Sequence, residues 1–214
     1  MQTVTGNKPA LRAAILLCAS LLLLAGCGAP TLQDSFLRPD LDLAFIERIA
    51  VPPFENHSTD KYAGARLRDI TITHLLMRGD FTVVDKGIVD SAISEEAIKP
   101  GAPLGEDTIK RLGQALGVQA LLLGTIDQLS EDRQGGAASP RLTCTLRLVD
   151  TAGGTILWQA AGSRSGATMS SKLFGTAVRD EFQVGRELIA DLLATLPARP
   201  SQEQVKNEET ATAD

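Results

Sequence analysis

The sequence predicts an α/β (α+β) domain over residues 47–197, in which helices pack on the faces of a mixed β-sheet of about five strands. Short apolar runs, which are typical of strands, alternate with segments of helical periodicity as far as residue 126. An alternating strand and a return strand follow, and a long amphipathic segment closes the domain. Strands that alternate with helices and end in a hairpin are expected to form a mixed sheet covered by helices.

Residues 1–26 have the composition of a lipoprotein signal peptide. Lys8 and Arg12 form a basic start, and Ala13–Leu24 is an apolar run of 12 residues. This run is too short to span a bilayer, which takes about 20 residues. The closing tetrad Leu24-Ala25-Gly26-Cys27 resembles the bacterial lipobox, which implies cleavage before Cys27 and acylation of its thiol. An ordinary signal peptide with a cysteine near its end is the alternative.

The residue after Cys27 is Gly28 rather than an aspartate, which by resemblance to lipoprotein sorting signals implies delivery to the outer membrane. We therefore expect a chain that is lipid-anchored and faces the periplasm, with the choice between inner and outer membrane resting on Gly28. Residues 27–46 contain two prolines and no sustained period. They are expected to be a tether that reaches at most about 65 Å.

The mature chain is predicted to be acidic. Loss of residues 1–26 removes two of the 21 basic residues and no acidic one, which leaves 19 basic against 26 acidic residues, a formal charge of −7. Such a chain is not expected to bind nucleic acid. Cys18 leaves with the signal peptide and Cys27 takes the lipid, so Cys144 remains without a cysteine to pair with in the chain.

The first half of the domain is predicted to be strand, helix, strand. Arg48–Val51 is expected to form a strand that ends at Pro52, because proline cannot donate to a ladder. A helix follows, with Gly79 in a left-handed conformation at its end, and Phe81–Val84 is the second strand. The apolar face of this helix is expected to hold Ala63, Leu67, Ile70, His74 and Met77.

In the second half, residues 87–98 and 107–116 are predicted to be helices, and Ala120–Ile126 is predicted to be the central strand because it is apolar throughout. Glu131–Pro140, rich in small residues, is expected to be a loop. Residues 142–148 and 155–161 are expected to form a hairpin. The final helix is predicted to carry Phe174, Val178, Phe182, Leu188, Ile189, Leu192, Leu193 and Leu196. Residues 198–214 are expected to be a disordered acidic tail.

Three stretches resemble the CsgG-like lipoprotein superfamily. They are RIAVPPFEN at residues 48–56, LGQALGVQALLLG at 112–124 and LRLVDTAGGTILW at 146–158. The superfamily includes the curli secretion lipoprotein, PelC and activator lipoproteins of penicillin-binding proteins, and the amino-terminal domain of TolB has a related fold. The resemblance covers about residues 47–197. It implies the fold, self-association and a protein partner in the envelope, either export machinery or a cell-wall synthase.

No catalytic, cofactor-binding or metal-binding residue is predicted, and the protein is not expected to be an enzyme. His57 beside Asp60 could in principle form an acid–base pair, whereas His74 is expected to be a core or boundary residue. Gly162–Gly166 has an arginine at the centre of what would be a nucleophile elbow, so it is expected to be a loop. The sequence has no zinc-binding His-Glu-x-x-His helix, Cys-x-x-Cys pair or phosphate-binding glycine loop.

Two further side chains have alternative interpretations. Cys144 alternates with leucines and is expected to be a buried structural thiol rather than a nucleophile. Trp158 is expected to pack in the core, although an interface anchor is the alternative. The sequence does not decide whether Trp158 or the Glu131–Pro140 loop forms an interface.

The leading functional hypothesis is a non-enzymatic scaffold or accessory subunit of the outer membrane, acting in envelope assembly or in secretion and polysaccharide export. An activator that binds a penicillin-binding protein is the alternative, and the shortness of the tether weighs against it. An envelope hydrolase that uses the His57 region is a remote third. The exported substrate, the partner and the number of subunits are not predicted.

Overall fold

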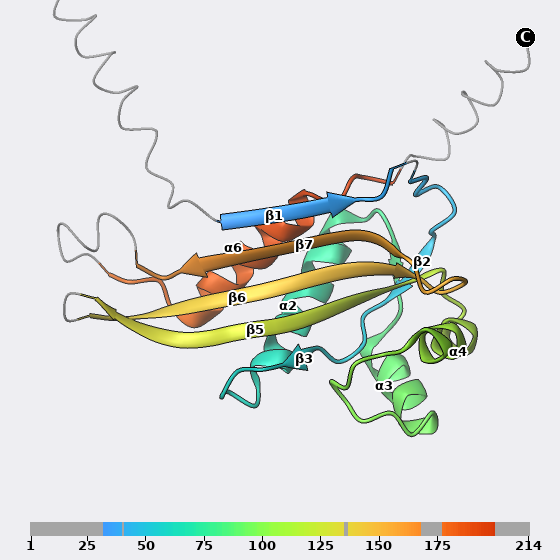
Figure 1. Cartoon of the computed structure of the whole chain (residues 1–214), viewed down its shortest axis with the longest axis horizontal. Coiled ribbons are helices and arrows are strands. Elements are labelled where there is room, and N and C mark those ends of the chain that lie inside the picture. Colours follow the sequence, from blue (N-terminus) through green and yellow to red (C-terminus); the bar gives the residue numbers. More distant parts are fainter. Residues whose placement is uncertain (1–31, 40, 135–136, 168–176, 200–214) are drawn as a thin grey trace, which may run out of the picture. The chain divides into compact units, whose positions relative to one another are not determined.

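The computed structural model describes residues 32–39, 41–134, 137–167 and 177–199, all of them within the second of two units of the chain, Thr31–Asp214. Over these residues it shows a seven-stranded mixed sheet with helices on its faces (Figure 1). This confirms the predicted fold class. The predicted signal peptide, Cys27, Gly28, Phe174 and the tail from residue 200 lie outside the described residues.

The strands follow the order β1-β7-β6-β5-β2-β4 across the sheet, and β3 pairs with β5. Their bounds are β1 Leu32–Leu37, β2 Arg48–Ala50, β3 Glu55–Asn56, β4 Thr82–Val83, β5 Ala120–Gln134, β6 Ala137–Asp150 and β7 Ile156–Ser165. The helices of the described chain are α2 Ala63–Arg78, α3 Lys86–Glu95, α4 Glu106–Leu116 and α6 Glu181–Ala194.

One half of the sheet is parallel. β2 pairs in parallel with β4 on one side and with β5 on the other. The chain runs from β2 through α2 to β4, on one side of β2. It then crosses back through α3 and α4 to β5, on the other side of β2. Ile49 belongs to the core beneath α2 and α6, and the next residue, Ala50, belongs to the core beneath α3 and α4. Helices therefore cover both faces of β2, a covering that the apolar pattern predicted only for Ala120–Ile126.

The other half is antiparallel and extends further than predicted. β5 and β6 pair as far as Gln134 and Ala137, with an irregularity between Ile126 and Gln128. The expected Glu131–Pro140 loop is therefore wrong, since most of it forms the end of a long hairpin. Residues 162–165, expected to be in a loop, belong to β7. Small residues have low intrinsic strand preference, but pairing with a neighbouring strand overrides it here.

The predicted tether overlaps the sheet. β1 pairs with β7 along six positions, from Leu32 opposite Ser163 to Leu37 opposite Trp158, and Leu43 and Ile46 are buried in the core. The expected tether over residues 27–46 is therefore wrong for Leu32–Leu37, which form a strand, and the later described residues are irregular as expected but pack on the domain at Leu43 and Ile46. The sequence of β1 has no alternating apolar pattern because the side chains from Asp34 to Leu37 are exposed. Backbone pairing with β7 along one edge holds the strand in place.

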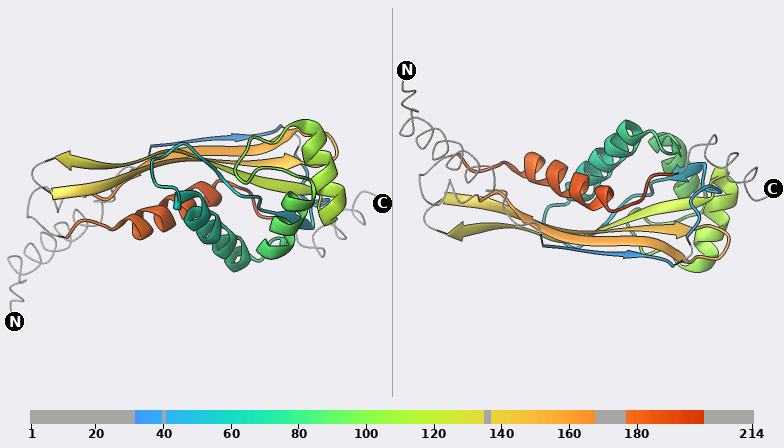
Figure 2. Two further views of the ribbon diagram at one scale, coloured as in Figure 1. Left: turned by 90° about the horizontal axis from the view of Figure 1, so that it is seen from below. Right: turned by 90° about the horizontal axis from the view of Figure 1, so that it is seen from above.

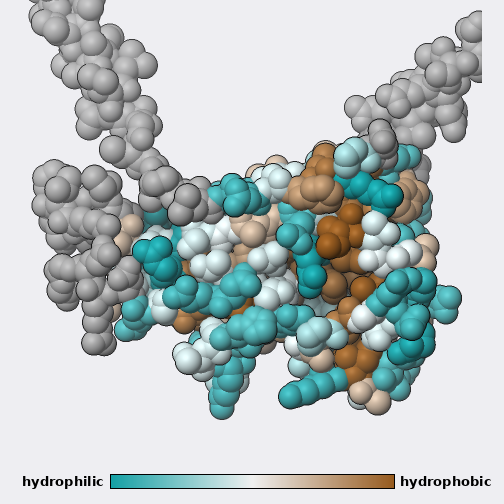
Figure 3. Space-filling model, in the orientation of Figure 1, coloured by the Kyte–Doolittle hydropathy of each residue, from teal (hydrophilic) through white to brown (hydrophobic). Residues whose placement is uncertain are grey.

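The larger core lies between the sheet and the layer formed by α2 and α6 (Figure 2). Trp158 is fully buried there, and its Nε1 donates a hydrogen bond to Thr195 Oγ1 at 3.1 Å. Cys144 is also fully buried, and burial raises the pKa of its thiol. Both side chains thus have the structural roles predicted for them. The opposite sheet face is mostly hydrophilic or neutral toward the β5–β6 hairpin, and apolar residues gather toward the end nearer α3 and α4 (Figure 3).

The two long helices differ from prediction at their ends. Gly79 ends α2 in the left-handed conformation as expected (φ 72°), but Met77 is 76% exposed instead of being in the core. α6 begins at Glu181, with the Asp180 carboxylate accepting a hydrogen bond from Gln183 N. Val178 therefore precedes the helix, and Phe182 in its first turn is exposed.

We expect Gly124→Ala to destabilise the fold by about 1–3 kcal/mol, the usual cost of overpacking a core. A Cβ atom at Gly124 in β5 would lie 2.5 Å from the ring of Phe54, whose side chain is buried. Chemical denaturation measures the change in the free energy of unfolding. In the Phe54→Leu background the same substitution should cost clearly less, because the ring atoms that it meets are gone. Equal costs in both backgrounds would contradict this contact.

His74 is expected to make stability depend on pH. Burial, followed by the charge of Arg186, lowers the pKa of His74 below its ordinary value of 6.5. As the pH falls through that value, the unfolded chain binds a proton that the folded chain does not, so the free energy of unfolding decreases. Above about pH 7.5 the imidazole is neutral in both states and contributes no slope.

Thermal or urea unfolding between pH 7.5 and 5.5 should therefore show a smaller loss of stability for His74→Gln than for the wild type. Arg186→Gln should give an intermediate profile, because it removes the second cause of the shift. Superimposable profiles for all three proteins would refute this role of His74.

Candidate functional site

A groove of about 630 Å³ opens where the chain leaves the carboxyl ends of β2 and β4. The chain continues from β2 toward β4 on one side and returns to β5 on the other. In open sheets with parallel strands, ligands bind outside the carboxyl ends of the strands at such a reversal. We call this the switch-point groove. It is lined by Pro53, Phe54, Asn56, Lys61, Gly64, Ala65, Arg68, Lys86, Asp90, Ile93, Lys99, Pro100 and Gly101.

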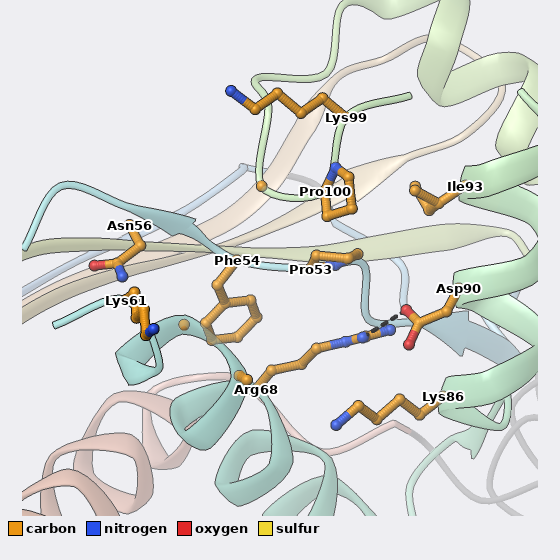
Figure 4. A pocket seen from close by; sticks show the side chains of 13 residues that line it. Pro53, Phe54, Asn56, Lys61, Arg68, Lys86, Asp90, Ile93, Lys99 and Pro100 are labelled. Carbon is orange, nitrogen blue, oxygen red and sulfur yellow. Dashed lines mark hydrogen bonds and ion pairs between the residues drawn. The ribbon is translucent and has the colours of Figure 1, made fainter. Parts of the chain in front are cut away.

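Four different segments supply its walls (Figure 4). Pro53 and Phe54 follow β2, Arg68 projects from α2, Asp90 lies on α3, and Lys99 belongs to the connection between α3 and α4. That connection approaches closely at Gly101, which has φ +75° and where a Cβ atom would lie 2.9 Å from the carbonyl oxygen of Phe54. The left-handed backbone and the close approach both require glycine there.

Arg68 is the central charge of the groove. Its Nε donates to the carbonyl oxygen of Val51 at 2.8 Å, and its Nη1 donates to Asp90 Oδ1 at 2.6 Å. The residue is 3% exposed, and its Nη2 is enclosed without a hydrogen-bond partner among the described residues. A buried charge is normally paired and fully hydrogen-bonded. One nitrogen of this guanidinium is therefore left without an acceptor, enclosed in the wall of the groove.

Three lysines surround the groove. Lys61 lies 4.8 Å from the centre of the Tyr62 ring, Lys86 Nζ is 2.6 Å from Asp69 Oδ1, and Lys99 is exposed. With Arg68 they are four cations, against the carboxylates of Asp90 in the groove and Asp69 beside it. The groove is thus locally positive in a chain whose formal charge is −5.

A second candidate site is the α2–α6 surface, a hollow of about 550 Å³ on the outside of the helical layer. Its apolar side chains Met77 and Phe182 are 76% and 63% exposed. We define this surface by the residues Ile70, Thr73, His74, Met77, Phe182 and Arg186. Apolar groups that remain in contact with water on a folded domain are typical of protein–protein contact sites.

Arg66 closes one side of this surface by pairing with both Asp60 and Glu181. It therefore links the start of α6 to the segment before α2. Hydrogen bonding from Arg66, aided by the backbone N–H of Tyr62, lowers the pKa of the Asp60 carboxyl. Asp60 is thus engaged in an ion pair at neutral pH.

The acid–base pair that His57 and Asp60 could in principle form is not seen in the structure. His57 Nε2 lies 3.5 Å from Glu55 Oε2, whereas Asp60 is held by Arg66. His74 lies on the α2–α6 surface. Among the described residues, no three histidine, cysteine or acidic side chains gather as they would around a metal ion. The structure therefore offers two binding surfaces and gives the hydrolase interpretation no support.

Sequence reasoning missed both surfaces. Pro53 and the Lys99–Gly101 segment lie outside the helices and strands that the sequence predicts, and Met77 and Phe182 were expected on the apolar faces of helices. The order of the parallel strands was the missing information, because it alone brings the segments after β2 and β4 together. A basic residue near each expected helix start, Lys61 and Lys86, is the signal that was available.

The described part of the chain has no helix that is long and apolar enough to cross a membrane. Comparison with solved structures finds the PelC dodecamer from Paraburkholderia phytofirmans, at 20% identity and a TM-score of 0.53 over 80% of this chain and 100% of that chain. Lipoprotein GNA1162 from Neisseria meningitidis follows, at 18% identity and a TM-score of 0.49 over 75% and 99% of the two chains. At these identities the likeness concerns the fold.

The C-terminal domain of LpoB from Escherichia coli is also similar, at 18% identity and a TM-score of 0.42 over 55% of this chain and 82% of that one. No curated protein gives a significant match. The likeness to PelC concerns the fold alone. The wider CsgG-like assignment stays a prediction.

The family comparison is more specific. A model described as peptidoglycan-synthase activator LpoB matches residues 43–163, which is more than half of the chain and runs from the segment before β2 almost to the end of β7. The match includes all four segments that line the switch-point groove. The chain therefore belongs to the peptidoglycan-synthase activator LpoB family.

Proposed function

We propose that this protein is a non-catalytic accessory lipoprotein of the bacterial envelope that binds a peptidoglycan synthase and raises its activity. The family match over residues 43–163 carries the proposal. It reverses the order of the hypotheses drawn from the sequence, in which an export scaffold came first. Activation by binding also requires no catalytic residues, in keeping with a site made of contact surfaces.

The α2–α6 surface is the proposed contact with the synthase. Met77 and Phe182 are large, exposed apolar side chains on neighbouring helices, and such side chains are typical anchors of protein interfaces. Charged residues Asp69 and Arg186 border the hollow, which gives it the polar rim that interfaces usually have.

The anchor limits where this contact can take place. If Cys27 carries the lipid, four residues, 28–31, separate it from the start of β1. The five Cα–Cα steps from Cys27 to Leu32, at 3.3–3.6 Å each, span at most about 18 Å. This reach is far shorter than that of the predicted tether of residues 27–46. The domain therefore stays beside its membrane, and we infer that the synthase presents its contact region there.

Acylation of Cys27 is tested by metabolic labelling with an alkyne-bearing palmitate analogue in the native host. We expect labelling of the wild type and of Cys144→Ala, because Cys144 is buried in the core. Cys27→Ser should lose the label and leave the membrane fraction, since without acyl chains only a cleavable or short apolar segment remains. Equal labelling of Cys27→Ser would refute the anchor. Separation of inner and outer membranes then tests the inference from Gly28.

The proposed synthase contact is tested by glycan polymerisation with purified mature protein and the bifunctional synthases of its host. We expect the wild type to stimulate one of them, and Met77→Glu and Phe182→Glu each to reduce stimulation at least tenfold, because a charge would be desolvated at the interface. Leu76→Glu is the matched control. Leu76 is 61% exposed on the same helix but does not line the hollow, so stimulation should persist.

A second candidate function is an oligomeric scaffold at the membrane. The similarity to a chain crystallised as a dodecamer, over its full length, and the short anchor both favour it. Sedimentation velocity of the mature protein distinguishes the two functions. A ring with no stimulation of any synthase would replace the activator proposal, whereas a monomer that stimulates would exclude the scaffold.

A further inference from the structure

We propose that the switch-point groove binds a small organic anion that carries carboxylate or phosphate groups. This inference is independent of the synthase contact, which lies on the α2–α6 surface. It assigns a ligand to the cavity at the carboxyl ends of β2 and β4, and it rests on the charge, the leftover donor and the shape of that cavity.

The first argument is the state of Arg68. Its Nε and Nη1 bonds to Val51 and Asp90 tie the end of β2 to α3, which is a structural role. That role does not account for Nη2, which is enclosed and has no hydrogen-bond partner among the described residues. Because Nε and Nη1 are already used, the remaining donor is a single nitrogen, and a carboxylate or phosphate oxygen is the charged acceptor that bonds a guanidinium most strongly. An anion in the groove would complete the hydrogen bonding of this side chain.

The second argument is the convergence of charge. Lys61, Lys86 and Lys99 come from three separate segments and surround the same cavity as Arg68 (Figure 4). Asp90 and Asp69 offset two of these four charges. The remaining excess of positive charge would be a solvated surface feature if it lay on a flat face. Lys61 and Lys99 are exposed at the groove, and its apolar walls strengthen the positive field that they and Arg68 produce there.

The third argument is the size and lining of the groove. Its volume of about 630 Å³ lies within the range of sites for small molecules, roughly 300–1,000 Å³. Pro53, Phe54, Ile93 and Pro100 give it apolar walls between the charged groups. An inorganic ion would leave these walls unused, whereas an organic molecule with anionic groups contacts both the walls and the cations.

The experiment uses the full mature lipoprotein in detergent and isothermal titration calorimetry with three probes. Citrate represents polycarboxylates, glucose 1,6-bisphosphate represents phosphorylated molecules, and hexaglutamate represents an acidic peptide segment. Glucose is the neutral control. We expect citrate or the bisphosphate to bind, and the affinity to fall as salt rises because exposed lysines contribute. Binding of citrate alone or of the bisphosphate alone identifies the anionic group.

Matched variants locate the site. The double variant Lys61→Glu/Lys99→Glu should weaken binding at least tenfold, and both side chains are exposed, so folding should persist. The control Lys110→Glu/Arg186→Glu makes the same change in net charge on α4 and α6, outside the groove, and should leave the affinity within about twofold. Arg68→Lys keeps the charge but loses the planar fork, and is expected to weaken binding while thermal unfolding reports its stability.

The proposal is overturned if neither citrate nor the bisphosphate binds, or if the control pair weakens binding as much as the groove pair. Binding of hexaglutamate in the absence of binding by either small molecule also overturns it, because the groove would then be a peptide-docking site.

Discussion

The parallel pairing of β2 with both β4 and β5 is the constraint on which the rest of the structure depends. β2 has three residues, but Ile49 and Ala50 are fully buried on opposite faces. Each face therefore needs its own helical layer, α2 with α6 on one side and α3 with α4 on the other. The chain has to depart from the same end of β2 and β4 to form both layers. The groove is the space that these departures leave, so the cavity follows from the strand order.

Arg68 connects the fold to that cavity. Its bonds to Val51 and Asp90 join the β2 segment, α2 and α3 beyond the end of β2. Because the guanidinium is almost fully enclosed, its charge is screened poorly by water and acts on the groove. Removing the Arg68 side chain would change packing and charge together. Substitution of the exposed Lys61 and Lys99 changes mainly the charge, so it tests anion binding with less effect on folding.

The sequence predicted those parts of the fold in which burial follows a regular period. β2, β5, β6 and the helices α2, α3 and α4 were found at nearly their observed positions, because each has an apolar stripe or run that local reasoning detects. β1 was missed because its exposed side chains carry no such pattern, and the distal hairpin was missed because pairing, not burial, stabilises it. The two surfaces were missed for a related reason. Lys61 and Arg68 are more than 30 residues from Lys99 in the sequence, and Met77 and Phe182 fit the apolar period but face solvent.

The edge strand β1 has the largest functional consequence of these corrections. A strand from Leu32 to Leu37 begins five residues after Cys27, so only residues 28–31 remain as a tether between the lipid and the sheet. If Cys27 is acylated, the domain stays close to its membrane on the periplasmic side, and a partner anchored elsewhere has to reach it there. An activator with this geometry differs from one that extends toward the cell wall on a long tether. In the proposed function it docks its partner at the membrane surface through the α2–α6 surface, and the switch-point groove, on a different part of the domain, is the proposed site of a small anion. Occupancy of the groove would brace α2 against α3 through Arg68, and α2 also carries Met77 of the contact surface. The two sites share one helix, which gives a physical route by which a ligand could influence partner binding.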